Sequence, residues 1–184
     1  MPYAIEILLD EVSASMVREV WSRLAEVAGG DYILRNGVYP HVAIAVLDDL
    51  GEPVRLQDML GSLAQGVQPA SLRQTGIAYF QSQRPVVYLG FARTGFLERL
   101  HAQVQVVLTS LGLSNNEYYQ WNQWQPHCTL AMEFEAENLE AVAATAKAVE
   151  WNVPFRAAAL GMIEYPPTKL TWSSPLGGKV NNRP

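Results

Sequence analysis

Two short stretches, Pro40-His41-Val42-Ala43 and Pro126-His127-Cys128-Thr129, decide how this sequence is interpreted. Each places a histidine directly after a proline and at the start of an apolar run, which is typical of a buried strand. Each run also follows a periodic helix and a loop, and 86 residues separate the two histidines. The sequence therefore predicts that one structural pattern occurs twice, with a histidine opening the same strand in each copy.

The alternation of a strand predicts which side chains share a face. Residues two apart point to the same side, so His127 and Thr129 are expected together. The opposite, core-facing row then consists of Cys128, Leu130, Met132 and Phe134. In the first strand the same alternation puts His41, Ala43 and Ala45 on one face and Val42, Ile44 and Val46 on the other. The two histidines thus occupy matching positions in matching strands.

The rest of the chain alternates between strand and helix patterns. Apolar periodicity and turn residues predict strands at residues 3–9, 38–47, 72–80, 85–91, 126–134, 153–164 and 169–172. Helices are expected at residues 15–27, 53–63, 95–111 and 139–149. Ser13 or Ser15 could cap the first helix, and Gly29-Gly30 would end it. We expect residues 1–175 to form a single domain and residues 176–184 a loosely ordered tail.

Composition and charge exclude some classes of ligand and cellular location. The chain has 184 residues and a net charge of −5, so its overall field does not attract a long polyanion such as duplex DNA. Apolar residues never run far enough to span a membrane, and no secretory signal is visible, so a cytoplasmic location is expected. The one cysteine, Cys128, cannot form an internal disulfide. A small phosphate ligand or an RNA end remains compatible with this charge, because a few donors suffice for one phosphate.

The paired motifs resemble those of the LigT-like 2H phosphoesterases, the 2′-5′ RNA ligase family, which carry one His-x-Thr/Ser motif in each half. The resemblance covers about residues 3–172, since the order of strands and helices around each motif also matches. It implies an α+β fold with two lobes, each an antiparallel sheet with helices outside. A pseudo-two-fold axis would relate the lobes, with both histidines facing a central cleft.

The resemblance also implies an activity, namely metal-independent hydrolysis of cyclic or 2′-5′ phosphodiesters in nucleotides or at RNA ends. Such a protein would act as a monomer without a cofactor. One imidazole would take a proton from water while the other gives one to the leaving oxygen, because a histidine exchanges protons near neutral pH. His41 and His127 would be the catalytic pair, and Thr129 would donate a hydrogen bond to the phosphate.

Ala43 departs from the family pattern, because it stands where the family has Thr or Ser. A lost hydrogen bond to a charged oxygen weakens binding or rate by about 1.5 to 3 kcal/mol. Tyr39, Arg35 or Arg84 could supply another donor. The departure leaves two alternatives open: a catalytically weakened module that binds nucleotides or RNA ends, and a purely structural domain.

An aromatic loop precedes the second motif, with four rings between Tyr118 and Trp124. Tyr119 and Trp121 are candidates for stacking on a base, although the same rings could simply close the end of the core. Tyr165 and Lys169, near the last turn, could reach the cleft. His101 lies in a periodic helix and is expected to be structural. No spacing of His, Cys or acidic residues indicates a metal site.

Overall fold

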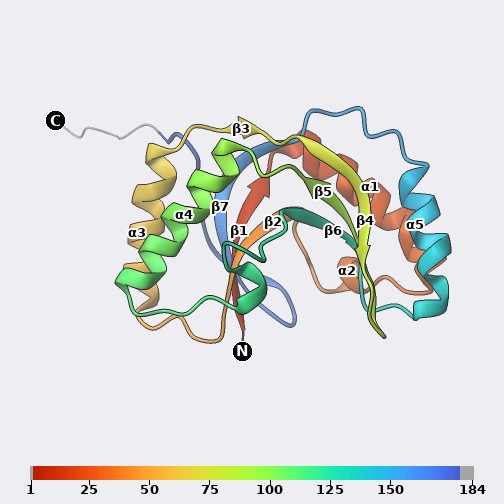
Figure 1. Ribbon diagram of the computed structural model, residues 1–184, viewed down its shortest axis with the longest axis horizontal. Helices are drawn as coiled ribbons and strands as arrows, with labels where there is room; N and C mark the ends of the chain where they lie inside the picture. The colour runs from red at the N-terminus through yellow and green to blue at the C-terminus, as the bar shows by residue number, and fades with distance from the viewer. Residues whose placement is uncertain (1, 179–184) are drawn as a thin grey trace.

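Two antiparallel sheets form the centre of the computed structural model, which describes residues 2–178 (Figure 1). The strands are β1 (Tyr3–Leu9), β2 (His41–Leu47), β3 (Ala70–Ser71), β4 (Gln74–Phe80), β5 (Val86–Phe91), β6 (His127–Ala131), β7 (Arg156–Glu164) and β8 (Lys169–Pro175). The helices are α1 (Glu11–Ala28), α2 (Tyr32–Arg35), α3 (Pro53–Gly66), α4 (Gly95–Ser110) and α5 (Leu139–Lys147). Short 3₁₀ turns cover Glu117–Tyr119 and Ala136–Asn138.

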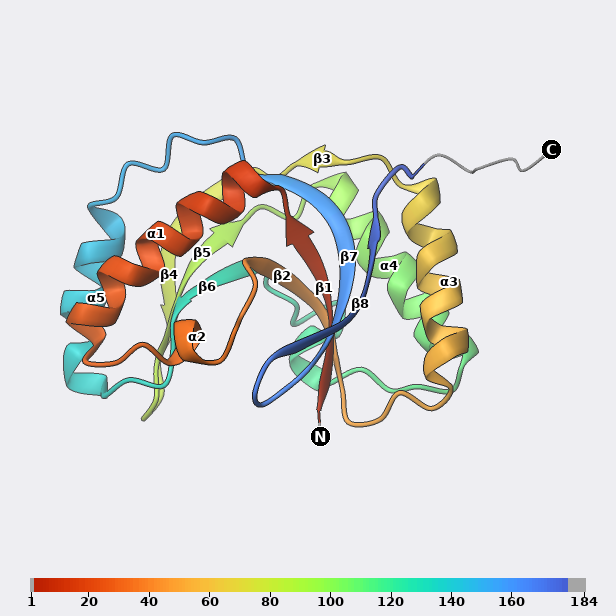
Figure 2. The same cartoon turned by 180° about the vertical axis from the view of Figure 1, so that it is seen from behind.

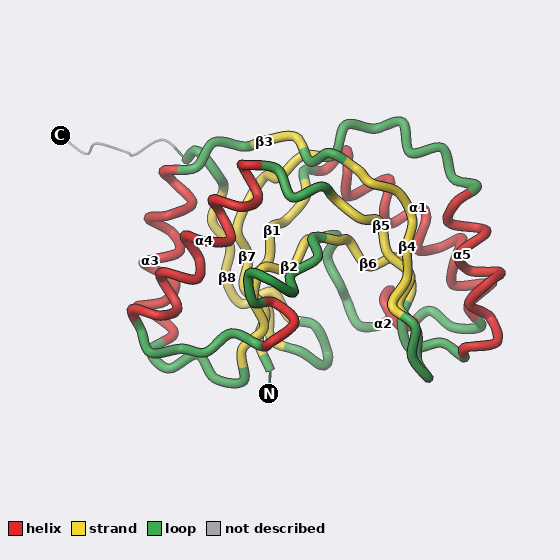
Figure 3. The backbone as a smooth tube through the Cα atoms, viewed as in Figure 1, coloured by secondary structure: helices red, strands yellow, loops and turns green. Residues whose placement is uncertain are grey.

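The strand order reveals the internal repeat. One sheet runs β2-β1-β7-β3, with β8 also paired to β7, and the other runs β4-β5-β6. The series β2-β1-β7 therefore corresponds to β6-β5-β4, with all pairs antiparallel. Figure 3 shows the two sheets curving around a common centre. The predicted α+β architecture of two antiparallel sheets with outer helices is confirmed.

The helices cross over between the two halves. α1 follows β1 in sequence but packs against β6 of the other sheet and against α5. α4 follows β5 but contacts β2 and α3 of the first sheet. Figure 2, the view from behind, shows α1 and α5 on one side and α3 and α4 on the other. Because each half supplies a helix to the other, the buried apolar residues join into one core.

Local chemistry sets the ends of α1. The Asp10 side chain caps it by accepting a hydrogen bond of 3.0 Å from the Ser13 backbone, so neither expected serine is the cap. The Ser13 hydroxyl also donates to this carboxylate. Gly29 ends the helix with φ of 72°, which disfavours any residue with a Cβ. Between these ends, the buried face includes Val17, Trp21 and Leu24.

Two of the strand boundaries that differ from expectation have a local cause, and one short helix was missed. β2 begins at His41 rather than at residue 38, because Pro40 cannot donate to the strand ladder. β6 ends at Ala131 rather than at residue 134, since Glu133 adopts φ of 56° and breaks the extended chain. The four-residue helix α2 was not predicted, because it is too short to show helical periodicity.

The expected loose tail is wrong for its first residues. β8 extends to Pro175, and the side chain of Leu176 is buried in the core. The Leu176 backbone donates to Ala158 at 2.8 Å, and Gly177 donates to Ala64 at 3.0 Å. Residues 179–184 lie outside the described part of the chain. Among the helices within residues 2–178, none has the length and apolarity that a membrane crossing requires.

Candidate active site

The two histidines are held by the same local device. Nδ1 of His41 lies 2.5 Å from the Tyr39 carbonyl, and Nδ1 of His127 lies 2.6 Å from the Gln125 carbonyl. A carbonyl oxygen can only accept, so Nδ1 carries the proton in both rings. A proline, Pro40 or Pro126, lies between each histidine and the residue whose carbonyl it contacts, and it favours an extended conformation of that preceding residue. In the neutral form of each imidazole, Nε2 is therefore left with its lone pair.

The strands that carry the histidines begin next to each other. In Figure 1, β2 and β6 start at the centre of the molecule and run apart from there. β2 and β6 contact each other, and the charge of His127 affects the pKa of His41. The pseudo-two-fold axis thus brings the two halves together at their histidines.

A β-bulge interrupts each strand at the same place. Opposite β1, Glu6 pairs with Ala43 and Ile5 pairs with Ala45, so Ile44 is the extra residue. Opposite β5, Tyr88 pairs with Thr129 and Val87 with Ala131, so Leu130 is the extra residue. A bulge reverses the alternation beyond it. Counted from each histidine, the two irregularities occupy identical positions.

Because of the bulges, three residues face the side opposite to the one that alternation predicts. Val46 and Met132 were expected to face the core, but both line the cleft. Ala45 was expected beside His41 and Ala43, but it is fully buried and does not line the cleft. Strict alternation is valid only for the first three residues of each strand, which are those of the motif.

Two tryptophans complete the symmetry. Nε1 of Trp21 donates to the Thr129 carbonyl and Nε1 of Trp124 donates to the Ala43 carbonyl, each at 2.9 Å. Both carbonyls belong to the third residue of a motif, on the strand edge that lacks a neighbouring strand in its own sheet. The indoles therefore satisfy backbone acceptors that would otherwise be buried without a partner.

A cleft of about 200 Å³ opens beside these strands. The residues that line it are Ala4, Glu6, Tyr32, Ile33, Val38, His41, Ala43, Val46, Tyr119, Thr129, Met132, Ile163, Tyr165, Pro166 and Thr168. It thus brings together five residues singled out in the sequence, namely His41, Ala43, Thr129, Tyr119 and Tyr165. None of the lining residues is a lysine or an arginine.

The other predicted contacts lie elsewhere. His127, which was expected to face the cleft, is not among the residues that line it and packs against the rings of Tyr88 and Phe80, with centroids 4.9 Å and 5.3 Å away. Tyr39 does not line the cleft, and its side chain is 47% exposed. Trp121 is 48% exposed and carries the Arg93 guanidinium 4.4 Å above its ring. These last two residues therefore do not contribute to the wall of the cleft in this structure.

The aromatic loop divides between cleft and core. Tyr119 lines the cleft, and Tyr118 is exposed. Trp124 is buried and stacks on His101, with ring centroids 4.4 Å apart. His101 is itself fully buried, and its Nε2 lies 2.8 Å from the Tyr119 carbonyl. One side of this loop therefore closes the core, and its Tyr119 side chain reaches the cleft.

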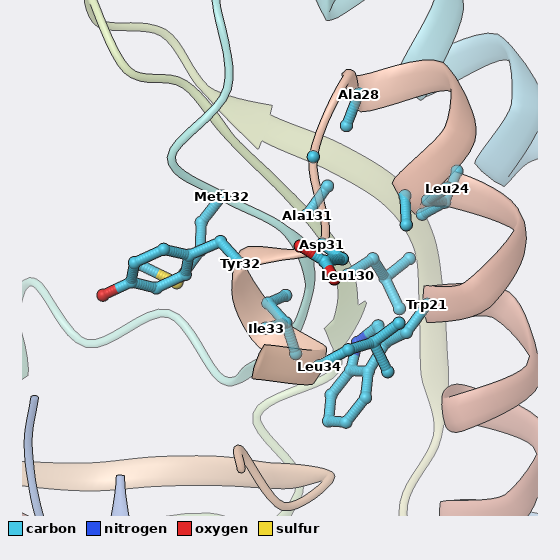
Figure 4. A pocket seen from close by; sticks show the side chains of 12 residues that line it. Trp21, Leu24, Ala28, Asp31, Tyr32, Ile33, Leu34, Leu130, Ala131 and Met132 are labelled. Carbon is cyan, nitrogen blue, oxygen red and sulfur yellow. The ribbon is translucent and has the colours of Figure 1, made fainter. Parts of the chain in front are cut away.

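A pocket beside α2 shows how the cleft gains Tyr32 and Met132. In Figure 4, side chains of α1, of α2 and of the segment Leu130–Met132 surround this pocket, with the Tyr32 ring beside Met132. Both side chains line this pocket and also the cleft. Tyr32 was not expected in the site, because α2 itself was not predicted.

Glu6 is the most important residue that sequence reasoning missed. It is the only charged residue in β1, its side chain is 1% exposed, and it lines the cleft. Its Oε1 lies 3.2 Å from Nε2 of His41. A lone acid among buried apolar residues is uncommon, and that signal was present in the sequence.

Burial dominates the electrostatics of the site. It raises the pKa of Glu6 well above its usual range and lowers the pKa of His41 to about 4. The hydrogen bond to Tyr39 opposes the shift of the His41 pKa, and nearby His127 reinforces it. Burial also lowers the pKa of His127. Both imidazoles are therefore predominantly neutral near pH 7, as a general base must be.

Other potential functional groups are less suited to chemistry. Burial raises the pKa of the Cys128 thiol to about 12, so this sulfur is a poor nucleophile. In residues 2–178, no three His, Cys, Asp or Glu side chains form a group that could hold a metal ion. The chemistry of the described cleft therefore rests on imidazole, hydroxyl and carboxyl groups.

Comparison with known proteins gives a family match. Residues 12–168 match the family described as the 2′-5′ RNA ligase superfamily. No curated protein matches the chain.

Several solved structures share the fold. TT0787 of Thermus thermophilus is 19% identical, with a TM-score of 0.56 over 97% of this chain and 100% of that one. E. coli LigT complexed with 3′-AMP is 15% identical, with a TM-score of 0.52 over 96% of each chain. Kluyveromyces marxianus Usb1 with uridine monophosphate is 12% identical, with a TM-score of 0.51 over 95% and 97%.

Proposed function

Since the chain belongs to the 2′-5′ RNA ligase superfamily of LigT-like 2H phosphoesterases, we propose that it hydrolyses cyclic or 2′-5′ phosphodiesters of nucleotides or RNA ends. Catalysis uses His41 and His127 as general acid and base and needs no metal ion. The observation that carries this proposal is the matched tautomer of the two imidazoles. Each Nδ1 is held by a carbonyl two residues earlier, so both neutral rings offer Nε2 for proton transfer.

The composition of the cleft favours a diester over a monoester. A phosphodiester carries one negative charge, whereas a phosphate monoester carries nearly two at neutral pH. No lysine or arginine lines the cleft, so no cationic side chain there would balance a second negative charge. The substrate is therefore a monoanion, and the more highly charged product leaves readily. The Thr129 hydroxyl donates to a phosphate oxygen, and the Tyr119 and Tyr165 rings contact the nucleoside.

Two of the similar structures support a nucleotide ligand. By their descriptions, E. coli LigT is complexed with 3′-AMP and Kluyveromyces marxianus Usb1 with uridine monophosphate. Both share the arrangement of sheets found here, so a nucleoside with an attached phosphate is the natural first ligand to test.

The test is turnover of 2′,3′-cyclic nucleotides and of an oligonucleotide ending in a cyclic phosphate, measured in EDTA. We expect product from the wild type and none from His41→Ala or His127→Ala, with circular dichroism showing that both variants fold. Gln123→Ala, an exposed neighbour in the loop before β6, is the control and should match the wild type. Turnover that needs added metal, or that survives both histidine substitutions, would overturn the proposal.

Ala43 favours a second candidate, a module that binds nucleotides or RNA ends with little or no turnover. The first motif has no hydroxyl at this position, so one phosphate contact of the family is absent. In the same assay this candidate predicts saturable nucleotide binding by calorimetry without product.

A further inference from the structure

The carboxyl of Glu6 lies in the proposed phosphate site, where an acidic side chain is unexpected because the ligand is itself negatively charged. It is almost completely buried, and it lies across the strand ladder from Ala43, on the cleft side of β1. Oε1 has no hydrogen-bond partner within residues 2–178, although Nε2 of His41 lies 3.2 Å away. An orphaned buried oxygen facing a catalytic atom calls for a functional explanation.

This contact requires one proton. Nδ1 of His41 already uses its hydrogen on the Tyr39 carbonyl. If Nε2 and Oε1 were both unprotonated, two lone pairs would face each other without compensation. A proton on either group, the carboxyl of Glu6 or Nε2 of His41, removes this repulsion. In both forms, the pair of Glu6 and His41 holds a single proton.

The second half of the molecule has no such pair. The register of the sheets places Tyr88 opposite Thr129, as Glu6 lies opposite Ala43. Tyr88 presents its ring to His127, with centroids 4.9 Å apart. His127 therefore has no carboxyl at the equivalent position, and the two otherwise symmetric histidines differ in their supply of protons.

Resting on the phosphoesterase function proposed above, we propose that Glu6 is a positioning residue that holds a proton for His41. This makes His41 the general acid and His127 the general base. The family pattern alone leaves these two roles interchangeable.

The proton balance of the reaction is complete. Water gives a proton to Nε2 of His127 as its oxygen bonds to phosphorus. The bond from phosphorus to the leaving ribose oxygen breaks, and that oxygen takes the proton that His41 carries on Nε2. This hydrogen can reach the leaving oxygen because it is not hydrogen-bonded to Glu6. His127 then releases its proton to solvent, and the pair of Glu6 and His41 regains one.

The imidazole of His41 is by itself a weak source of protons. Burial lowers its pKa to about 4, and such a group is protonated in roughly one molecule in a thousand at pH 7. The other titratable groups that face Glu6 are Tyr119, Tyr165 and Cys128, whose pKa values are all raised by burial. They stay neutral and do not release a proton near pH 7. Asp48 faces Tyr165 rather than His41.

Two substrates that differ in leaving group test the proposal. A nucleoside 2′,3′-cyclic phosphate expels an alkoxide, which needs an acid. A nucleoside 3′-(4-nitrophenyl) phosphate expels nitrophenolate, which does not. We expect Glu6→Gln to lower kcat on the cyclic substrate about 100-fold, the lower end of the range for a positioned proton transfer, and to leave nitrophenolate release nearly unchanged. His41→Ala should show the same selectivity, whereas His127→Ala should lose both reactions.

The control is Glu140→Gln, an exposed acid on α5, which should match the wild type on both substrates. Glu6→Gln should also move the high-pH limb of the rate profile on the cyclic substrate to lower pH. Equal losses on both substrates would show a structural role for Glu6 and overturn this inference alone. So would nitrophenolate release that survives in His127→Ala but not in His41→Ala. A wild type inactive on both substrates would overturn the phosphoesterase function and this inference with it.

Discussion

Trp124 donates its indole hydrogen to the carbonyl oxygen of Ala43 at 2.9 Å, and so links the loop before the second motif to the backbone of the first. Trp21 makes the corresponding bond from α1 to Thr129. Each motif is thus fixed by a tryptophan that packs with the other half of the fold. The geometry of the two histidines therefore depends on both halves at once.

Trp124→Phe should destabilise the protein and disturb the first motif. The substitution keeps an aromatic ring but leaves the Ala43 carbonyl without a donor, and an unsatisfied buried acceptor costs about 1 to 3 kcal/mol. Trp21→Phe should lower the free energy of unfolding by a similar amount through Thr129. Unfolding in urea measures the free energy of unfolding of both variants against the wild type. Stability equal to the wild type in both variants would mean that water replaces the indoles.

Ala43→Ser should improve the proposed reaction. A hydroxyl at this position faces the cleft opposite Thr129, and a hydrogen bond to a charged phosphate oxygen contributes about 1.5 to 3 kcal/mol. We therefore expect kcat/KM on a cyclic nucleotide to rise by roughly tenfold or more.

The matched change in the other half is Thr129→Ala, which should lower kcat/KM by a similar factor, whereas Thr129→Ser should be close to the wild type. If Ala43→Ser lowers activity while Thr129→Ser does not, the space beside Glu6 does not admit a second polar group, and the two motifs are not interchangeable in function.

Most of the fold could be predicted from the sequence, because the elements that matter show strong periodicity. The paired motifs, the order of strands and helices and the repeated pattern all follow from spacing that a single chain displays. The misplaced residues have specific causes. Val46 and Met132 turn to the cleft because of bulges at Ile44 and Leu130, which alternation cannot show.

The contacts that define the site depend on tertiary packing, and for that reason the sequence did not show them. Trp21 and Trp124 look like ordinary core residues until the helices cross between the halves. Trp121 looked like a stacking platform, but Arg93 already covers its ring. Glu6 carried the one signal that could have been used, a lone acid in the apolar strand Tyr3–Leu9.

Cys128 should react only when the protein unfolds. Its thiol is buried, and burial raises its pKa to about 12, so almost no thiolate is present at pH 8. Iodoacetamide should therefore label the native protein far more slowly than the chain in urea, with a rate that follows the unfolded fraction. Cys128→Ala should retain turnover. Rapid labelling of the folded protein would contradict the placement of this side chain in the core.

The stability of the protein should depend on pH through Glu6 and His41. Because the pKa of Glu6 is raised on folding, its contribution to the free energy of unfolding is largest below 4.5, the pKa in the unfolded chain. This contribution is lost as pH rises toward the pKa in the folded protein. The pKa of His41, lowered to about 4, acts in the opposite sense, with a contribution that is complete above 6.5 and lost as pH falls. The two slopes cancel between 4.5 and 6.5, where the folded pair and the unfolded chain each hold one proton.

From pH 6.5 up to the raised pKa of Glu6, the folded pair keeps a proton that the unfolded chain has released, so the wild type should lose up to about 1.4 kcal/mol of stability per pH unit. Glu6→Gln removes this loss, because the remaining His41 is neutral in both states there. Urea unfolding at several pH values between 4 and 8 should therefore show that Glu6→Gln gains stability over the wild type as pH rises. Glu140→Gln should follow the wild type throughout. A difference between wild type and Glu6→Gln that does not change from pH 6.5 to 8 would mean that Glu6 carries no proton in the folded protein, and its partnership with His41 would then be one of position alone.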